Sequence, residues 1–236
     1  MRRTFEDALV WSATGTRLFS EAVAGWGEEQ YRAPSSLPGW TRKHLVAHVA
    51  ANADALGNLV RWAATGEETP MYSSAGQRAA EITAGSRKPA AELAAWLRES
   101  ADRLAAGTAG LGPAQWNATV VTAQGRTVPA TEILWLRSRE VCVHAVDLAA
   151  DVSFADLPIA FLAALADDIV VRRGDASGPA VVLDAAGTGD RWELPGDGAV
   201  TRVTGPLAEI VAYLAGRPHT LTTAGGSPAP QLPAWL

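Results

Sequence analysis

The chain has 236 residues, of which 48% are hydrophobic and 19% charged, and its formal net charge is −5 at pH 7. This composition indicates one large or two modest globular domains and excludes a disordered chain, while the acidic balance gives no reason to expect nucleic acid. The sequence has no apolar run long enough to span a bilayer, and its N-terminus turns acidic where a signal peptide would turn apolar. The single cysteine, Cys142, excludes an internal disulfide, so we expect a cytoplasmic protein.

The first two thirds of the sequence predict helices. Apolar residues recur at helical spacing, with Thr4 and Thr41 placed as N-caps and Gly residues near the predicted ends. The stretch between the third and fourth long helices, rich in Gly, Thr and Pro, is predicted to be irregular. The predicted helices cover residues 4–25, 41–64, 75–84, 86–107 and 129–150.

Beyond residue 152 the pattern changes. Helices are predicted over residues 157–173 and 206–217, and between them lie three short β-like segments separated by Gly and Asp turns, at 180–184, 191–194 and 200–203. We therefore predict an α+β protein. Residues 1–152 are expected to form a four-helix bundle that carries the metal-binding site, and residues 153–236 a smaller α+β domain.

A candidate metal site follows from the helix over 129–150. Glu140 and His144 lie one turn apart on one face, so a carboxylate oxygen and an imidazole nitrogen can reach one ion. His48 lies on the apolar face of the helix over 41–64 and is expected to point inward. Two histidines and one glutamate leave a coordination position open, which is typical of a catalytic zinc, although other divalent ions accept the same ligands.

Each of these residues also has an ordinary structural interpretation. A glutamate one turn from a histidine is often only a pair on a helix surface. His44, one turn before His48, competes for the ligand role but follows two basic residues near the helix start, which favours a supporting or exposed position. Cys142 lies about 200° round the helix from Glu140, so we interpret it as a small buried residue.

Two arginines, Arg217 and Arg126, are candidates for binding an anionic substrate. Arg217, at the end of the last predicted helix, can bind a carboxylate with its planar guanidinium, or can complement the helix C-terminus. Arg126, in the loop before the helix over 129–150, is a weaker substrate-binding candidate. Arg137 lies one turn before Glu140 and can pair with that residue or with Glu132.

Specific motifs in this chain resemble the mycothiol-dependent maleylpyruvate isomerases of actinobacteria, members of the DinB-like metal-dependent superfamily. The resemblance covers nearly the whole chain and is densest in four stretches. These are Gly39-Trp40-Thr41-Arg42 through His48, Thr65-Gly66-Glu67-Glu68-Thr69-Pro70-Met71-Tyr72, Thr122 through Ala130, and Arg137-Ser138-Arg139-Glu140 with His144-Ala145-Val146-Asp147-Leu148.

The resemblance implies both a ligand set and an activity. By motif, His48, Glu140 and His144 are expected to bind zinc, and Arg217 matches a catalytic arginine in its Leu-Ala-Gly-Arg context. The implied reaction is cis-to-trans isomerisation of maleylpyruvate to fumarylpyruvate, in the gentisate route of aromatic degradation. The thiolate of mycothiol, held on the metal, would add to the double bond, allow rotation and leave again, while Arg217 stabilises the developing negative charge.

Two other functions remain open from the sequence. A mycothiol S-transferase would use the same metal and thiol but release a stable adduct of another electrophile. A non-catalytic metal- or ligand-binding regulatory module would lack at least one of the three ligands, yet all three are present. The expected partners are mycothiol and a small-molecule substrate, with no nucleic acid and no membrane, and the expected state is a monomer.

Overall fold

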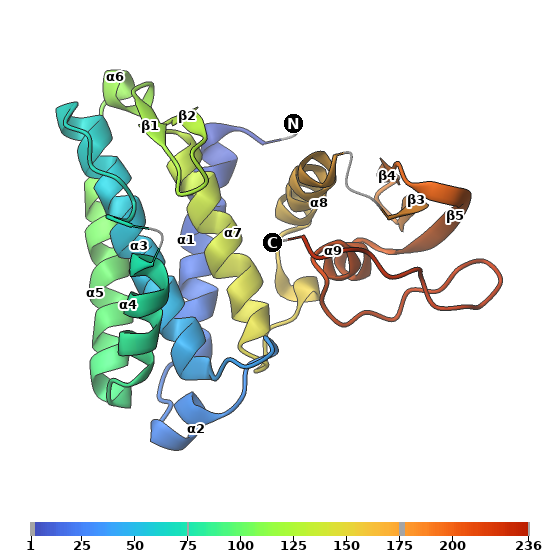
Figure 1. Ribbon diagram of the computed structural model, residues 1–236, viewed down its shortest axis with the longest axis horizontal. Helices are drawn as coiled ribbons and strands as arrows, with labels where there is room; N and C mark the ends of the chain where they lie inside the picture. The colour runs from blue at the N-terminus through green and yellow to red at the C-terminus, as the bar shows by residue number, and fades with distance from the viewer. Residues whose placement is uncertain (1–2, 75, 175–177, 236) are drawn as a thin grey trace. The chain divides into compact units, whose positions relative to one another are not determined.

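The computed structural model describes residues 3–74, 76–174 and 178–235. The chain forms two compact units, one of Phe5–Val152 and one of Ser153–Leu236 together with Met1–Thr4 (Figure 1). The first unit is mainly helical, whereas the second combines helices with a three-stranded sheet. The predicted α+β class is therefore confirmed. Of the predicted short helix over 75–84, residue 75 lies outside the described part of the chain.

Four long helices form the bundle of the first unit, in which α1 and α3 each pack on α7 and α3 also packs on α5. Their core faces carry apolar residues at helical spacing, such as the fully buried Leu45, Val49 and Leu56 of α3. Three shorter helices complete the described part of the unit. The long helices are α1 (Phe5–Ala22), α3 (Arg42–Thr65), α5 (Ala90–Ala109) and α7 (Glu132–Asp147), and the short ones α2 (Glu28–Arg32), α4 (Gln77–Ser86) and α6 (Pro113–Trp116).

Some short elements differ from the sequence prediction. The five-residue helix α2 lies in a stretch predicted as a connection, and the region predicted as irregular contains α6 and an antiparallel hairpin, β1 (Thr119–Val121) and β2 (Thr127–Pro129). Elements of three to five residues are too short to show a hydrophobic period. The hairpin is held on the bundle by Val120 and Val128, whose side chains are buried.

The helices α1 and α7 approach each other closely at Gly15. A Cβ atom at this position would lie 2.5 Å from the Cys142 sulfur and from a Val141 methyl group, so only glycine fits. Cys142 is fully buried at this contact, and burial raises the pKa of its thiol to about 12. The interpretation of Cys142 as a small buried residue agrees with this environment.

The second unit contains η1 (Phe154–Asp156), α8 (Ile159–Arg173), β3 (Pro179–Ala186), β4 (Arg191–Leu194), β5 (Asp197–Pro206) and α9 (Leu207–Leu214). In the sheet, β3 is central, antiparallel to β4 and parallel to β5. The last helix was predicted to run to Arg217 but ends at Leu214. Gly216 has a φ of +69°, a left-handed conformation that ends helices and that glycine adopts without strain.

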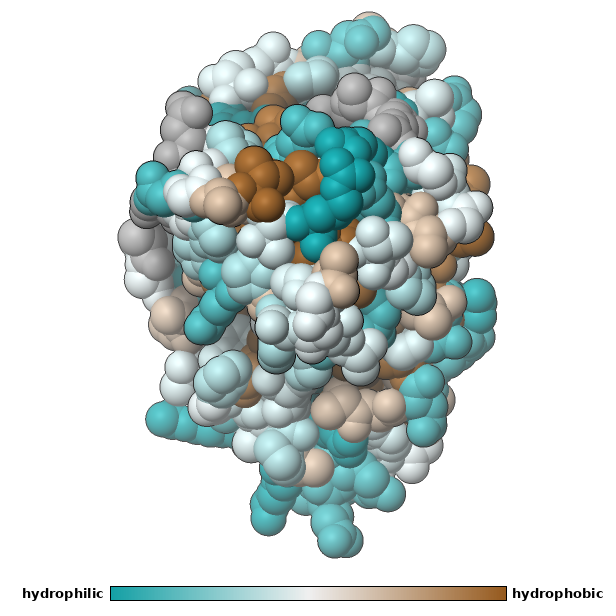
Figure 2. Space-filling model, turned by 90° about the vertical axis from the view of Figure 1, so that its right-hand side faces the viewer, coloured by the Kyte–Doolittle hydropathy of each residue, from teal (hydrophilic) through white to brown (hydrophobic). Residues whose placement is uncertain are grey.

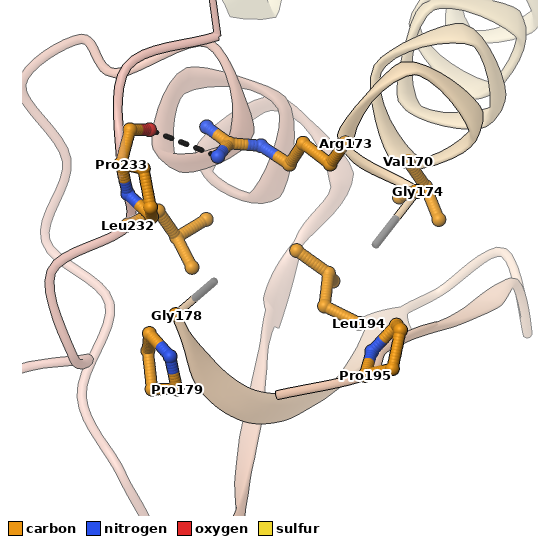
Figure 3. Close-up of a pocket in the computed structure, with 9 residues that line it drawn as sticks. All are labelled: Val170, Arg173, Gly174, Gly178, Pro179, Leu194, Pro195, Leu232 and Pro233. Atoms are coloured by element: carbon orange, nitrogen blue, oxygen red, sulfur yellow. Dashed lines mark hydrogen bonds between the residues drawn. The ribbon is translucent and has the colours of Figure 1, made fainter. Parts of the chain in front are cut away.

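The C-terminal tail is attached to α8 and α9 through backbone carbonyls. Arg173, at the end of α8, donates from Nη1 to the Pro233 carbonyl at 2.8 Å (Figure 3) and from Nη2 to the Leu214 carbonyl at 3.0 Å. The Tyr213 hydroxyl donates to the Pro230 carbonyl at 2.6 Å. The cavity beside Arg173 in Figure 3 has a volume of about 20 Å³, which suits one water molecule and no larger ligand.

Among the described residues no helix combines the length and the apolar character that crossing a membrane requires. On the face drawn in Figure 2, hydrophobic residues form small groups among hydrophilic ones. Scattered exposed apolar residues of this kind, including Ile159 and Val171, are normal for a protein surface.

Candidate metal centre

The helices α3 and α7 bring His48, Glu140 and His144 together at their contact. Thr41 begins α3 as its N-cap, and the heptad-like spacing of Leu45, Val49 and Leu56 turns His48 into the core, where it is 2% exposed. Glu140 and His144 project from α7 one turn apart. The three side chains thus face each other within the bundle of the first unit.

The distances between the three side chains suit a shared ion. His48 Nε2 lies 2.8 Å from Glu140 Oε2, and His144 Nε2 lies 3.4 Å from the same oxygen. One donor atom from each residue lies within 4.8 Å of the other two. Ligands about 2.1 Å from a tetrahedral zinc ion are roughly 3.4 Å apart, so only small side-chain adjustments separate this arrangement from a coordination shell.

A buried aspartate orients His144. The Nδ1 atom of His144 lies 2.9 Å from Oδ2 of Asp147, which is fully buried, and Ser36 donates its hydroxyl to the other carboxylate oxygen at 3.0 Å. Because Asp147 accepts the proton of Nδ1, Nε2 is the nitrogen that faces Glu140. A carboxylate behind a metal-binding histidine is the usual way to fix its tautomer and ring orientation.

The two histidines have opposite pKa shifts. Burial lowers the pKa of His48 and outweighs the bond to Glu140, so this ring is neutral. Burial acts in the same direction on His144, but the bonds to Asp147 and Glu140 prevail and raise its pKa to about 9. Burial alone would raise the pKa of Glu140, yet the bonds from His144 and His48 hold it well below its ordinary value, so Glu140 is a carboxylate.

The remaining candidates from the sequence lie elsewhere. His44 bonds through Nδ1 to the hydroxyl of Thr41 at 2.8 Å and completes the cap of α3, in line with a supporting position. Arg137 does not hydrogen-bond to Glu140; it donates to the Val49 carbonyl and to Asn52. Arg126 is exposed at the turn of the β1–β2 hairpin, where its backbone bonds to Thr122.

Arg217 belongs to the second unit. Its backbone amide donates to the Ala212 carbonyl at 2.8 Å, and its guanidinium donates to the Ala215 carbonyl, which places it at the C-terminus of α9. The side chain is half-buried. Its substrate role, like that of Arg126, remains a prediction.

Sequence reasoning missed three residues that act on the site through a hydrogen bond or through charge. Asp147 is one of them. Arg78, on α4, carries a charge that helps to lower the pKa of His48, and Tyr72 is close enough to Glu140 for that carboxylate to help raise the pKa of its phenol, after burial as the main cause. Asp147 and Tyr72 lie inside stretches on which the family resemblance rests, so that signal was available.

In this chain two imidazoles and one carboxylate from the helix bundle converge on one point. The protein therefore contains a helix bundle with a candidate metal site in its core. The family profile described as the mycothiol maleylpyruvate isomerase N-terminal domain matches residues 12–149. A search of the curated proteins gave no match.

Two solved structures are similar to the whole chain. They are crystal structures of the mycothiol-dependent maleylpyruvate isomerase and of a mutant of it with one histidine replaced by alanine. Each is 40% identical to this chain, with a TM-score of 0.93, and the match covers 99% of this chain and 98% of the other. The chain therefore belongs to the mycothiol-dependent maleylpyruvate isomerase family.

Proposed function

We propose that this protein isomerises maleylpyruvate to fumarylpyruvate, with mycothiol and a divalent metal, zinc, as cofactors. The observation that carries the proposal is the convergence of His48, Glu140 and His144 within 4.8 Å at the centre of the first unit. The isomerase whose crystal structures are similar over the whole chain supports the choice of substrate and thiol.

The residues at the site fit zinc. Two imidazole nitrogens and one carboxylate oxygen are ligands that zinc prefers, and three protein ligands leave a position open for a thiol. The bound metal would lower the pKa of mycothiol's thiol, so that a nucleophilic thiolate is present at neutral pH. We propose His48, Glu140 and His144 as the residues that hold the ion.

The chain's own residues hold this site and its charges in place. Asp147 keeps Nε2 of His144 directed at the site, and Glu140 supplies the negative charge that a divalent cation requires. Arg78 places a positive charge near His48, which suits a substrate with two carboxylates. Cys142, the one cysteine of the chain, has a pKa of about 12 and is buried, which fits the need for an external thiol.

We further propose that Arg217 stabilises the negative charge that develops on the keto or carboxylate oxygens of the substrate, since its planar guanidinium can bind a carboxylate in bidentate fashion. Arg126 is a weaker candidate for binding the substrate. The partners are then small molecules alone, and we propose a monomer that works in the cytoplasm, where a reduced thiol cofactor persists.

The test follows maleylpyruvate conversion by the purified, zinc-loaded protein with mycothiol added and withheld. We expect fumarylpyruvate only with mycothiol, and a loss of at least about a hundredfold in His48→Ala, which removes a proposed metal ligand. His44→Ala is the matched control, because it removes a histidine one turn away on the same helix and should retain most of the activity.

Product analysis decides among the alternatives. A stable thiol adduct that accumulates while mycothiol is consumed would replace the isomerase with a mycothiol S-transferase. Equal rates with and without mycothiol would contradict the cofactor, and full activity of His48→Ala would contradict the metal site.

A further inference from the structure

A groove of about 630 Å³ runs between α1 and α5, away from the three proposed metal ligands, none of which is among the described residues that line it. Small side chains such as Ala13 and Ala105 leave the space between the two helices open, and Leu9, 47% exposed, lies on its wall. Phe5 and Trp116 also line it, with their rings edge to face at 4.9 Å. The volume is within the range of pockets that bind small molecules, about 300–1,000 Å³.

The side chain of Arg137 lines this apolar groove from α7. It is 2% exposed, and its Nη1 donates to the Val49 carbonyl at 2.8 Å and to Oδ1 of Asn52 at 3.0 Å, both neutral acceptors. The buried Nη2 has no hydrogen-bond partner among the described residues. The acidic groups Glu140 and Asp54 act on the pKa of Arg137 through their charge.

A guanidinium in this position is incompletely compensated. Burial lowers the pKa of Arg137 to about 10, so the group still carries its charge at neutral pH. A buried charge that lacks a carboxylate partner, and a buried N–H that donates to nothing, both cost free energy. A carboxylate delivered by a ligand would recover part of that cost through a charge-assisted hydrogen bond.

We propose that the groove between α1 and α5 binds an amphiphilic carboxylate, with the apolar body of the ligand between the two helices and its carboxylate on Arg137. Arg17, the other basic residue on the groove, is exposed and already paired with Glu21 at 2.7 Å, so it is the poorer partner. The small and highly charged maleylpyruvate does not match the apolar walls. The groove is therefore a second site for a different class of ligand.

The proposal is tested by titrating the intact, zinc-loaded protein with dodecanoate and with dodecanol, both below their aggregation concentrations. Calorimetry, or the fluorescence of Trp116 and its neighbours, reports binding. We expect saturable binding of one dodecanoate per chain and at least about tenfold weaker binding of the uncharged alcohol. Arg137→Gln should remove this preference for the carboxylate, whereas Arg17→Gln should preserve it.

A second pair of variants keeps the test independent of folding, since Arg137 is buried. Ala105→Phe fills the groove from an exposed position on α5 and should abolish binding of both probes, whereas Ala106→Phe, its exposed neighbour outside the groove, should not. Equal affinity for dodecanoate and dodecanol, or no binding of either, would overturn the proposal. So would dodecanoate binding that survives Ala105→Phe, or a dimer of the chain that covers the groove at working concentrations.

Discussion

The carboxylate of Asp147 is fully buried and bonds to both His144 and Ser36. It is not one of the three residues proposed to bind the metal. It accepts from the ring nitrogen that faces away from Glu140. In the metal site proposed above, Asp147 would therefore orient His144 and would not itself bond to the ion.

Replacing Asp147 by asparagine should lower the metal affinity about 10- to 100-fold, because the amide holds the imidazole tautomer less firmly. Competition with a chelator of known affinity measures the change. Asp151→Asn, an exposed aspartate four residues later, is the control and should bind metal as the unmodified protein does. Unchanged metal affinity in Asp147→Asn would show that the aspartate has no positioning role.

Glu28 links α2 to two other helices and should make stability depend on pH in the acid range. Its carboxylate accepts bonds from the ammonium of Lys43, from the Ala90 amide at 2.9 Å and from Arg32, and the first of these is the main reason why its pKa falls to about 2. The unfolded chain has a glutamate pKa of about 4.3. The depressed folded pKa therefore adds stability above about pH 4.3, and this contribution is lost as the pH falls from there to about 2.

Glu28→Gln should accordingly lower the unfolding free energy at pH 7 and flatten its dependence on pH between about 4.3 and 2. Urea unfolding at a series of pH values measures both effects. Glu29→Gln replaces the exposed neighbouring carboxylate and should leave the dependence of the unfolding free energy on pH unaltered. If the unfolding free energy of Glu28→Gln still fell as steeply between about pH 4.3 and 2 as that of the unmodified protein, another group would be responsible for the loss of stability.

Two glycines within helices differ in how closely the neighbouring helix approaches them. Gly15 touches Cys142 and Val141 across the α1–α7 contact, whereas a Cβ atom at Gly57 of α3 would meet nothing within 4 Å. Gly15→Ala should destabilise the protein by about 1–2 kcal/mol, since overpacking outweighs the gain in helix propensity. Gly57→Ala should stabilise it by about 0.5–1 kcal/mol. Chemical denaturation measures both, and equal effects of the two substitutions would contradict the close approach of α1 and α7.

Two adjacent arginines at the end of α8 form a matched pair for the attachment of the C-terminal tail. Arg173 bonds to the carbonyls of Pro233 and Leu214, whereas Arg172 pairs with Asp168 one turn earlier on the same helix, at 2.7 Å. Arg173→Met should cost about 2 kcal/mol and expose the tail to proteases, because it removes two charge-assisted hydrogen bonds. Arg172→Met should cost about 0.5 kcal/mol or less. If proteases cleaved the C-terminal tail equally slowly in both variants, Arg173 would not be the residue that holds the tail in place.

The elements also show where sequence reasoning succeeds. The long helices α3 and α5 were predicted because a stripe of apolar residues repeats over several turns, a signal that averages over many positions. The helix α2 and the β1–β2 hairpin were not predicted, since tertiary contacts stabilise such short segments and no local period marks them. The helix α9 ends three residues before the predicted Arg217, because Gly216 adopts a left-handed conformation that ends the helix, and a sequence pattern does not distinguish this from a helical glycine.

For the molecule as a whole, the site could be predicted only in part. Glu140 and His144 are local, and the helical repeat puts them on one face. His48 lies 92 residues before Glu140. Periodicity places His48 on the inward face of its helix, but no pattern within one sequence states which helices pack together, so its pairing with Glu140 is a hypothesis that the family resemblance supports. Arg78 and Tyr72 approach the site through the packing of α4 and its preceding loop, which periodicity does not describe.

Metal binding to residues from two helices should stabilise the whole fold. At a free zinc concentration of about 100 times the dissociation constant, the stabilisation is about 2.7 kcal/mol, which raises the melting temperature by roughly 5–10 °C for a chain of this size. His144→Ala should melt at a temperature that zinc does not change. Scanning calorimetry with and without zinc measures the shift, and an equal rise in the variant would place the ion at another site.

The bond between Ser36 and Asp147 joins residues 111 positions apart, and Arg42 bonds to the carbonyls of Leu148 and Ala149 over a similar span. Together with the pairing of His48 and Glu140, these contacts make the centre of the first unit one of its most non-local parts. Non-local contacts form late because a long stretch of chain must first be brought together. During synthesis on the ribosome, the centre cannot assemble until residues up to Ala149 have emerged, so the ion proposed above would bind only after the four long helices have been made.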